Sequence, residues 1–545
     1  MMKTNSDPIT LEVVRNKLDG IANEMQSTLL RSSFSTIVKE GLDASACLFT
    51  VKGESLAQAI AIPIHLVTLS PIMATFLKVF PLIEMKPGDI FLMNDPYLGG
   101  THLPDMALAF PIFVGEKIVG FSAAMTHHQD VGGKAPGSVP TDATEIFQEG
   151  IRIPPLKLCD GGVLNETLIA ILKRNVRVPD IFMGDLNAQI AACNVGSRRV
   201  QELCATYSNL DMVSLFSELL DRSEDMTRQA LRAIPEGTYS YTDYLDNDGI
   251  ELEKPVRIEV KVIIKNGSFE CDFTGTSKQV KGPFNCVPSG ALAAAGFAIR
   301  ALTNPAIPTN GGCLRPIKLT LPEGSIVNPR EPAAVNARTA TIKRVTGAIL
   351  AAFKDVLPDR VPADSGGELL FVSLGGARSN GQRYVIGDLL AGGSGASKFG
   401  DGVDVIETDA TNCMNLPVEA IELDSPIRVH QAKLRTNSGG AGEFRGGLGT
   451  VREYELLEGE AVMTHRGERH FHAAQGALGG EPGAPAKSII RRSDGTEEVV
   501  KSKMMAILKA GDRLIVETAG GGGYGRSSVR REAQVIADRA DGKVT

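Results

Sequence analysis

Two histidines and one aspartate in the segment 102–127 have side chains that bind divalent metal ions and a spacing that can bring them together. They are His102, Asp105 and His127, in a chain of 545 residues that has only eight histidines. Two imidazoles and one carboxylate leave coordination positions open, as a catalytic metal requires. His102 precedes Asp105 by three residues, across a tight Leu103-Pro104 step, so both side chains can reach one point. The spacing predicts a metal site if the fold also brings His127 there.

A β-hairpin would bring His127 to Asp105. The segments MALAFPIFV and KIVGFSAAM predict two strands joined by a turn at residues 115–117. With the turn centred on Glu116, Asp105 faces His127, and directly opposed side chains have Cβ atoms roughly 4.5–5.5 Å apart. A register shifted by one residue would present His128 instead. The sequence leaves both registers open.

Further polar residues near this pair are candidates for the same site. Asp43, in the stretch EGLDAS, is a candidate fourth ligand. His128 is the nearest candidate for a general base or for a hydrogen-bond partner of the ligands, and Asp130 is a candidate to orient it. The alternative interpretation is structural, because His-x-x-Asp pairs are common in hydrogen-bonded loops. One member of a His-His pair on a strand also often has only a packing role.

A second histidine cluster, THRGERHFHAAQG at 464–476, contains His465, His470 and His472. Arg466 and Arg469 lie between them, and two cations disfavour a divalent metal there. The pattern favours contact with an anion or a carbonyl group, or a solvated face.

Two glycine-rich segments superficially resemble nucleotide-binding loops. GGSGASKFGDG at 392–402 lacks the spacing of a phosphate loop, and GGGGYG at 520–525 is not followed by a β-α-β unit. Both are more typical of turns. The sequence therefore predicts no nucleotide site formed by this chain alone.

Composition narrows the class of protein. The net charge is −7, with 43% hydrophobic and 22% charged residues, which indicates a globular protein and argues against nucleic-acid binding. The first twenty residues show neither the apolar core nor the cleavage site of a signal peptide, and no apolar stretch is suited to span a membrane. Eight scattered cysteines without a C-x-x-C pair predict reduced, mostly buried thiols. A cytoplasmic location is expected.

The chain is expected to be a mixed α and β, multidomain protein. Apolar residues at three- and four-residue steps predict a helix over 8–38, and 285–303 is rich in helix-forming residues. The division predicted from these patterns has four parts: 1–170, an N-terminal α/β metal-binding region; 171–235, a helical segment; 236–425, a central α/β region; and 426–545, a β-rich C-terminal region.

Long ordered blocks of the chain resemble the hydantoinase B/oxoprolinase family. The blocks include IVKEGLDASACLFTVKGESLAQA, GDIFLMNDPYLGGTHLPDMALAFPIF, THHQDVGGKAPGS, NVRVPDIFMGDLNAQIAACNVGSRRV and ETAGGGGYG. The similarity extends from about residue 7 to about residue 526.

The resemblance implies a metal held by His102, Asp105 and His127, with Asp43 as an acidic residue upstream. Mn²⁺ or Zn²⁺ is expected, with Fe²⁺ as an alternative. It also implies an A-type partner subunit that binds ATP and phosphorylates the substrate carbonyl oxygen, so that the active form is a hetero-oligomer. Metal-bound water or bicarbonate would then attack the activated substrate.

Three functions follow from this resemblance. The first is a subunit of an ATP-dependent cyclic-amide hydrolase acting on hydantoin, oxoproline or lactam rings. The second is a subunit of an ATP-dependent ketone carboxylase of the acetone or acetophenone type. The third is a non-catalytic scaffold subunit with a structural metal, which would be closed by four protein ligands.

Overall fold

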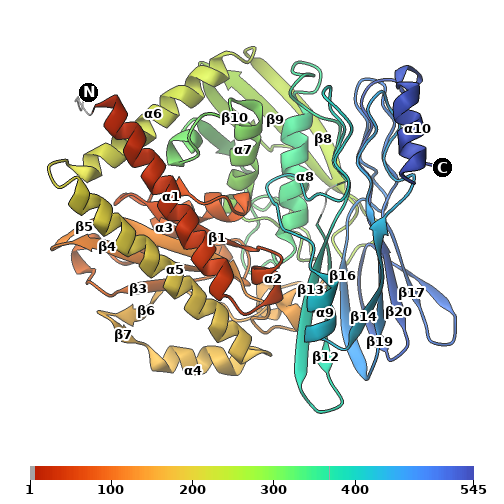
Figure 1. Cartoon of the computed structure of the whole chain (residues 1–545), viewed down its shortest axis with the longest axis horizontal. Helices are drawn as coiled ribbons and strands as arrows, with labels where there is room; N and C mark the ends of the chain where they lie inside the picture. Colours follow the sequence, from red (N-terminus) through yellow and green to blue (C-terminus); the bar gives the residue numbers. More distant parts are fainter. Residues whose placement is uncertain (1–6, 367–368) are drawn as a thin grey trace.

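The first sheet of the molecule carries the residues predicted to bind metal (Figure 1). The computed structural model describes residues 7–366 and 369–545. The sheet has seven strands in the order β2-β1-β5-β4-β3-β6-β7. They are β1 (Ala44–Phe49), β2 (Ser55–Gln58), β3 (Ile90–Met93), β4 (Asp105–Val114), β5 (Lys117–His127), β6 (Leu156–Asp160) and β7 (Val163–Leu164).

Helices cover both faces of this sheet, so its central strands are buried on both sides. On β4, Met106 and Leu108 belong to the core on one face, and Ala107 and Ala109 to the core on the other. This period of two is what a strand imposes. The first face packs against α1 (Pro8–Ser32) and α5 (Pro179–Thr206), and the second against α3 (Pro63–Val79). Shorter helices nearby are α2 (Thr36–Lys39) and α4 (Glu166–Asn175).

Local signals explain where α1 begins. Pro8 occupies the first turn, and the Asp7 carboxylate accepts a hydrogen bond from the Thr10 N–H, which satisfies an N–H group that the helix leaves unpaired. The predicted helix over 8–38 is thus confirmed for most of its length, and it ends at Ser32.

The second sheet has four strands in the order β11-β10-β9-β8. Its core packs against α7 (Pro288–Leu302) and α8 (Arg338–Ala351), where alanines such as Ala294 and Ala298 allow close approach. The helix predicted over 285–303 is confirmed as α7. The strands are β8 (Gly237–Leu245), β9 (Val256–Lys265), β10 (Ser268–Asp272) and β11 (Ile317–Thr320), and α6 (Met212–Arg232) precedes them.

Two further sheets pack face to face around a third core. Their orders are β13-β12-β16-β19 and β14-β15-β20-β17-β18. The strands are β12 (Leu369–Ala377), β13 (Arg383–Ala391), β14 (Ile427–Leu434), β15 (Thr450–Leu456), β16 (Glu460–Arg466), β17 (Lys487–Arg491), β18 (Glu497–Val500), β19 (Lys503–Lys509) and β20 (Arg513–Glu517); the helices α9 (Val418–Asp424) and α10 (Glu532–Ala540) accompany them.

The chain is a mixed α and β protein with several sheets, as predicted. Two of the predicted boundaries, at 170/171 and at 425/426, separate segments that pack together in the structure. Helix α5, from the segment 171–235, packs on the first sheet. The third sheet takes β12 and β13 from before residue 425 and β16 and β19 from after it.

The glycine-rich segments hold one another through their backbones. Gly521 N–H donates to the Gly447 carbonyl, and Gly393 N–H donates to the Ala519 carbonyl. A Cβ atom on Gly521 would lie 1.9 Å from the Ser394 carbonyl oxygen, and one on Gly393 would lie 1.9 Å from the Gly447 carbonyl oxygen. Chains this close exclude any side chain. These segments therefore pack against each other, which goes beyond the predicted turns.

Other expectations concern the surface and the thiols. All eight cysteines are free and seven are buried, as predicted.

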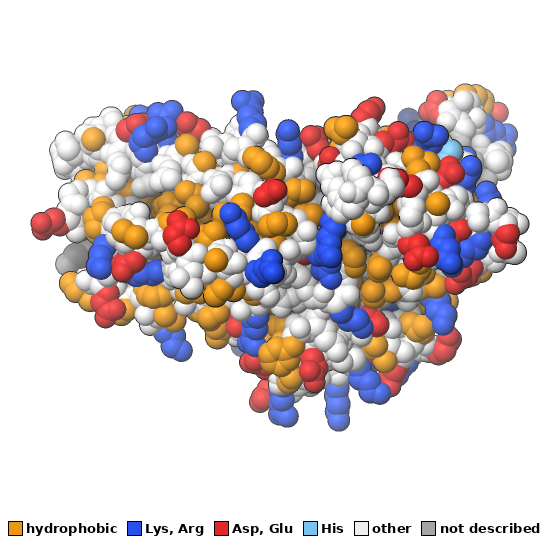
Figure 2. All heavy atoms as spheres, turned by 90° about the horizontal axis from the view of Figure 1, so that it is seen from below, with side chains coloured by type: hydrophobic (Ala, Val, Ile, Leu, Met, Phe, Trp, Pro, Cys, Tyr) orange, Lys and Arg blue, Asp and Glu red, His pale blue; other side chains and the backbone are white. Residues whose placement is uncertain are grey.

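Lys, Arg, Asp and Glu side chains intermix on the face seen in Figure 2, without a continuous basic area there. Within the described parts of the chain, none of the helices has the length and apolar character needed to cross a bilayer.

Candidate metal centre

The β4–β5 hairpin pairs Asp105 directly with His127, as the sequence predicted. The pairing near the turn differs from the prediction, because Val114 faces Lys117 instead of residue 118. A β-bulge between Ile112 and Phe113 places one additional residue, Val119, on β5. The bulge restores the predicted register over the rest of the hairpin, and His127 rather than His128 faces Asp105.

Side-chain atoms of His102, Asp105 and His127 converge at the open end of the hairpin. One ligand atom from each residue lies within 4.8 Å of the others, and all three residues are buried. His102 Nε2 is 2.9 Å from Asp105 Oδ1, and the rings of His102 and His127 are 4.9 Å apart. Among the described residues, no other group of three or more His, Cys, Asp or Glu side chains converges in this way.

The protonation of His102 makes this donor set suited to a cation. Its Nδ1 is 3.1 Å from the Asn336 carbonyl oxygen, which only accepts, so Nδ1–H is the donor. Burial, assisted by Arg338, lowers the pKa of His102 to about 4, so the ring is neutral near pH 7. Nε2 then carries a lone pair and faces a carboxylate oxygen. A divalent metal ion between the two atoms would satisfy both.

Asp105 keeps its negative charge in this buried position. Burial raises the pKa of its carboxyl group, but attraction to the neighbouring Arg338 and His65 outweighs this effect and holds that pKa well below its usual value. Arg338 Nη2 donates to Asp105 Oδ2 at 2.6 Å, and the Thr101 hydroxyl donates to the same oxygen. Oδ1 remains directed toward the histidines, so the arginine orients the carboxylate.

Asp43 and His65 lie beside the three residues. The carbonyl oxygen of Asp43 accepts the His127 N–H, which fixes the loop before β1 against the end of β5. His65 Nε2, from α3, is 3.6 Å from Asp43 Oδ1 and 3.4 Å from Asp105 Oδ1. Burial raises the pKa of Asp43 to about 6. The candidate fourth ligand is thus separated from the cluster by a histidine that is isolated in the sequence.

A cavity of about 30 Å³ faces these side chains. Such a space holds about two water molecules. Its wall includes Arg338 at the start of α8, and Arg466 and Phe371 on the adjacent strands β16 and β12. Burial, followed by repulsion from Arg338, lowers the pKa of Arg466 to about 9. The cavity therefore combines potential metal ligands with two buried guanidinium groups.

A second layer of residues holds the Asn336 carbonyl against His102. The Glu149 Oε1 atom accepts the N–H groups of Val335 at 2.9 Å and Asn336 at 2.8 Å. Asn336 Nδ2 also donates to the Ser138 carbonyl oxygen. Burial raises the pKa of Glu149 to about 8. No sequence pattern linked these residues to His102, because the contacts span up to 234 positions.

His128 lies behind the cluster, on the side of the sheet that α5 covers. Gln189 donates through Nε2 to two backbone carbonyls, so its Oε1 accepts from His128 Nε2–H at 3.1 Å. The His128 ring also packs against Phe182, with ring centres 4.5 Å apart. His128 does not line the cavity, and its catalytic role stays a prediction.

Asp130 organises the loop that follows His128. Its carboxylate accepts the N–H groups of Gly132, Gly137 and Arg177, and it pairs with the Arg177 side chain at 2.9 Å. These described contacts do not include His128, and the predicted orienting role stays a prediction.

The second histidine cluster is buried among protein groups. His465 Nδ1 donates to the Ser502 carbonyl oxygen at 3.2 Å, and its Nε2 faces the Ser488 hydroxyl at 2.9 Å. The Asp246 carboxylate accepts the backbone N–H groups of His470, Phe471 and His472. The cluster thus joins the loop after β16 to the end of β8, and it is not the solvated face that the pattern allowed.

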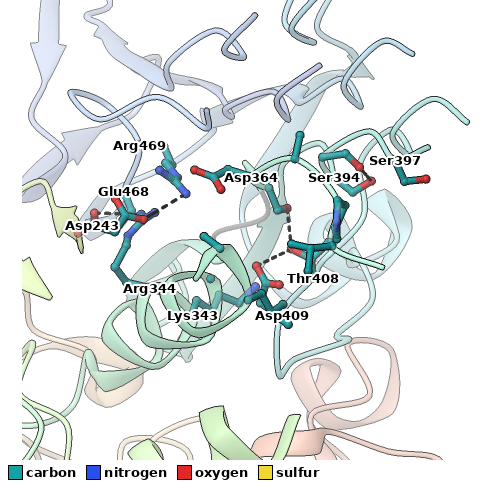
Figure 3. Close-up of a pocket in the computed structure, with 18 of the residues that line it drawn as sticks. Asp243, Lys343, Arg344, Asp364, Ser394, Ser397, Thr408, Asp409, Glu468 and Arg469 are labelled. Atoms are coloured by element: carbon teal, nitrogen blue, oxygen red, sulfur yellow. Dashed lines mark hydrogen bonds and ion pairs between the residues drawn. The ribbon is translucent and has the colours of Figure 1, made fainter. Parts of the chain in front are cut away.

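A larger cavity of about 320 Å³ lies along α8 (Figure 3). Thr339 lines the small cavity and the next residue, Ala340, lines the large one, so the start of α8 contributes to the walls of both. In the loop that follows β13, Thr408 lines the large cavity and Thr411 lines the small one. Figure 3 shows Thr408 and Asp409 on one side of the larger cavity and the Arg344, Glu468 and Arg469 group on the other, with the Asp364 carboxylate directed toward Arg469.

Comparison with known proteins relates the whole chain to one group. Residues 7–527 match the family model described as hydantoinase B/oxoprolinase. The B-type subunit of a putative D-/L-hydantoinase from Pseudomonas sp. (strain NS671) is 33% identical, covering 99% of this chain and 93% of its own length. The beta subunit of caprolactamase from Pseudomonas jessenii is also 33% identical, with 99% and 94% covered.

Solved structures agree with this relationship. The crystal structure of the ATP-dependent caprolactamase from Pseudomonas jessenii superposes with a TM-score of 0.93 at 33% identity, covering 99% of this chain and 95% of that one. Nucleotide-free acetone carboxylase gives a TM-score of 0.89, with 99% and 78% covered. At 19% identity the acetone carboxylase likeness establishes a shared fold only.

Proposed function

The chain belongs to the hydantoinase B/oxoprolinase family, and on that premise we propose that it is the metal-bearing subunit of an ATP-dependent cyclic-amide hydrolase. The observation that supports this proposal most directly is the buried cluster of His102, Asp105 and His127. The cluster faces a cavity of about 30 Å³, which has room for water. The relatives named hydantoinase and caprolactamase support a ring amide as substrate.

We infer that His102, Asp105 and His127 hold Mn²⁺ or Zn²⁺, with Fe²⁺ as the alternative, and that Asp43 or His65 completes the set. A bound metal supplies a water molecule of lowered pKa and a positive charge for the developing oxyanion. Arg338 orients Asp105, and the Asn336 carbonyl selects the His102 tautomer that exposes Nε2. Where His65 is the ligand that completes the set, the Asp43 carboxylate, with its pKa of about 6, is suited to accept a proton near pH 7.

The second part of the proposal concerns the partner. The relatives are named as B-type and beta subunits, which supports a hetero-oligomer. We propose that an A-type subunit binds ATP and phosphorylates the carbonyl oxygen of the ring amide. The glycine segments support this division of labour, because their backbones are engaged with each other at Gly393 and Gly521 and do not form a phosphate loop.

The hydrolase is tested with the two subunits together. ATP hydrolysis is measured against hydantoins, oxoproline, lactams and aryl ketones, with and without bicarbonate. We expect a cyclic amide to stimulate ATP turnover with ring opening, and His102→Ala to abolish this and to lose bound metal. His430→Ala is the control, because His430 on β14 pairs with Glu455 on β15 and lines neither cavity.

Two outcomes would replace the proposal. A carboxylated ketone formed only with bicarbonate would assign a ketone carboxylase. Full coupled activity in a His102→Ala variant without metal would assign the scaffold role to this chain.

A further inference from the structure

Arg466 differs from the other charged groups around the metal cavity because the described residues give it no ion-pair partner. It ends β16 and is only 6% exposed. Its Nη1 atom is buried without a hydrogen bond, and no described carboxylate lies within 4.0 Å of the guanidinium nitrogens. Its guanidinium group lies 5.2 Å from the centre of the Phe371 ring, which holds it in place from one side.

Arg338, the other guanidinium of the cavity, has a defined task. Its Nη2 donates to Asp105 at 2.6 Å and its Nη1 donates to the Thr339 hydroxyl. Asp43 lies on the same cavity and attracts the Arg466 charge from beyond ion-pair distance, while it lies closer to His65. One arginine therefore orients a candidate metal ligand, while the other lines the cavity without a direct ion-pair partner among the described residues.

An unpaired buried charge is unfavourable unless a ligand neutralises it. Guanidinium groups bind oxyanions of the carboxylate and phosphate types through directed N–H groups. The small cavity has room for about two oxygen-sized atoms, and Arg466, His102 and His127 all line it. Oxygens of an anionic group that enter this cavity would lie between Arg466 and the histidine cluster.

We propose that Arg466 binds the phosphoryl oxygens of the activated substrate, and of the phosphate released from it, beside the metal. This rests on the proposed function, in which the substrate reaches this chain as a phosphorylated amide. Arg466 is then a catalytic residue, because it contacts the reacting group and stabilises the charge that the leaving phosphate acquires.

Binding of inorganic phosphate to the Mn²⁺-loaded chain tests this directly by calorimetry, without turnover. Arg466→Gln retains much of the side-chain length and removes the charge, while Arg466→Lys retains a charge. The control is Arg452→Gln, because Arg452 is also buried with two nitrogens that make no hydrogen bond, but it pairs with Asp388 and lines neither cavity. We expect phosphate affinity to fall at least about tenfold in Arg466→Gln and less in Arg466→Lys. Metal content should stay unchanged in both, and the control should bind phosphate as the wild type does.

Three results would overturn the proposal. Phosphate affinity unchanged in Arg466→Gln would remove the arginine from the anion site. Loss of Mn²⁺ in both Arg466 variants would show that the residue maintains the metal site. Arg466-dependent binding of bicarbonate without binding of phosphate would assign a different anion.

A second experiment distinguishes free phosphate from the phosphoryl group of the substrate as the anion that Arg466 binds. Phosphate added during turnover competes with the phosphorylated substrate if both use Arg466, and we expect Arg466→Lys to weaken this inhibition. Arg466-dependent phosphate binding in a chain that no cyclic amide activates would refute the proposed function and leave the anion site standing.

Discussion

The two histidine clusters of this molecule are built from the same residue type and serve different ends. In the first cluster, His102 uses one ring nitrogen to donate to a carbonyl and directs the other toward the Asp105 carboxylate. In the second, both nitrogens of His465 have protein partners, the Ser502 carbonyl and the Ser488 hydroxyl. Each ring is buried, so burial alone does not separate a candidate ligand from a structural histidine.

The difference lies in what the second ring nitrogen faces. A lone pair opposite a carboxylate is stable only with a cation between them, whereas a lone pair opposite a hydroxyl is satisfied by its proton. The carboxylate of the second cluster, Asp246, is occupied by three backbone N–H groups. The first arrangement is open to a metal ion, whereas the ring of His465 in the second is satisfied by protein groups alone.

Removing the carboxylate charge of the first cluster should have the largest effect. We expect Asp105→Asn to lower metal affinity by more than about 100-fold, because even loss of a residue that only supports a ligand costs about 10–100-fold. Metal content after dialysis against a chelator checks this. His465→Gln, measured in parallel, should retain its metal. Equal metal content in the two variants would contradict the assignment of metal binding to the first cluster alone.

The next prediction concerns Glu149, which holds the Asn336 carbonyl in place against His102. Glu149→Leu removes the acceptor for the N–H groups of Val335 and Asn336, so the Asn336 carbonyl loses its fixed position. We expect a fall in metal affinity of about 10–100-fold. Glu149→Gln preserves an acceptor and should bind metal nearly as the wild type does. Titration of the apo protein with Mn²⁺ measures both, and identical affinities would mean that Glu149 does not position His102.

In the second cluster we expect a loss of stability instead. Asp246→Ala leaves three backbone N–H groups without their acceptor, and a single buried unsatisfied group costs about 1–3 kcal/mol. The free energy of unfolding in urea should fall by at least about 1 kcal/mol, with metal affinity unchanged. A variant that lost its metal while keeping its stability would contradict this assignment.

The smallest expected effect is a change in pH dependence. Burial lowers the pKa of His465 to about 3, below the ordinary value of 6.5. As the pH falls below 6.5, the unfolded chain therefore binds a proton that the folded ring does not, and stability decreases. Between pH 7 and 6 this histidine accounts for about 0.7 kcal/mol.

His465→Gln should remove this contribution, whether or not metal is present. Chemical unfolding at the two pH values measures it, with His430→Gln as the exposed control. A pH dependence identical to that of the wild type would show that His465 does not resist protonation in the folded protein.

The sequence predicted the hairpin pair well because Asp105 and His127 are 22 positions apart in one local motif. Alternating apolar residues set the faces of both strands, and a short turn set the pairing. The bulge at Val119 was not predicted, since its residues fit a regular strand equally well. The register at Asp105 was nevertheless correct.

The remainder of the site depends on contacts between distant segments. His65 reaches Asp105 from α3, and Arg338 reaches it from the start of α8. Arg466, at the end of β16, lines the cavity beside them. Nothing in the local pattern around these residues specifies a common neighbour. The pattern of the second histidine cluster favoured contact with an anion or a carbonyl group, or a solvated face, and Arg466 is the member of it that lines the metal cavity.

The bulge at Val119 also has a consequence for chain length. It lies about seven residues from Asp105, or roughly 23 Å along the strand, and it absorbs one residue without changing the register beyond it. Deleting Val119 would convert the outer hairpin into a regular one and leave Asp105 opposite His127. Deleting a residue between Phe121 and Thr126 would instead bring His128 into that place. The hairpin thus tolerates insertions and deletions at its outer end and forbids them near the metal cluster.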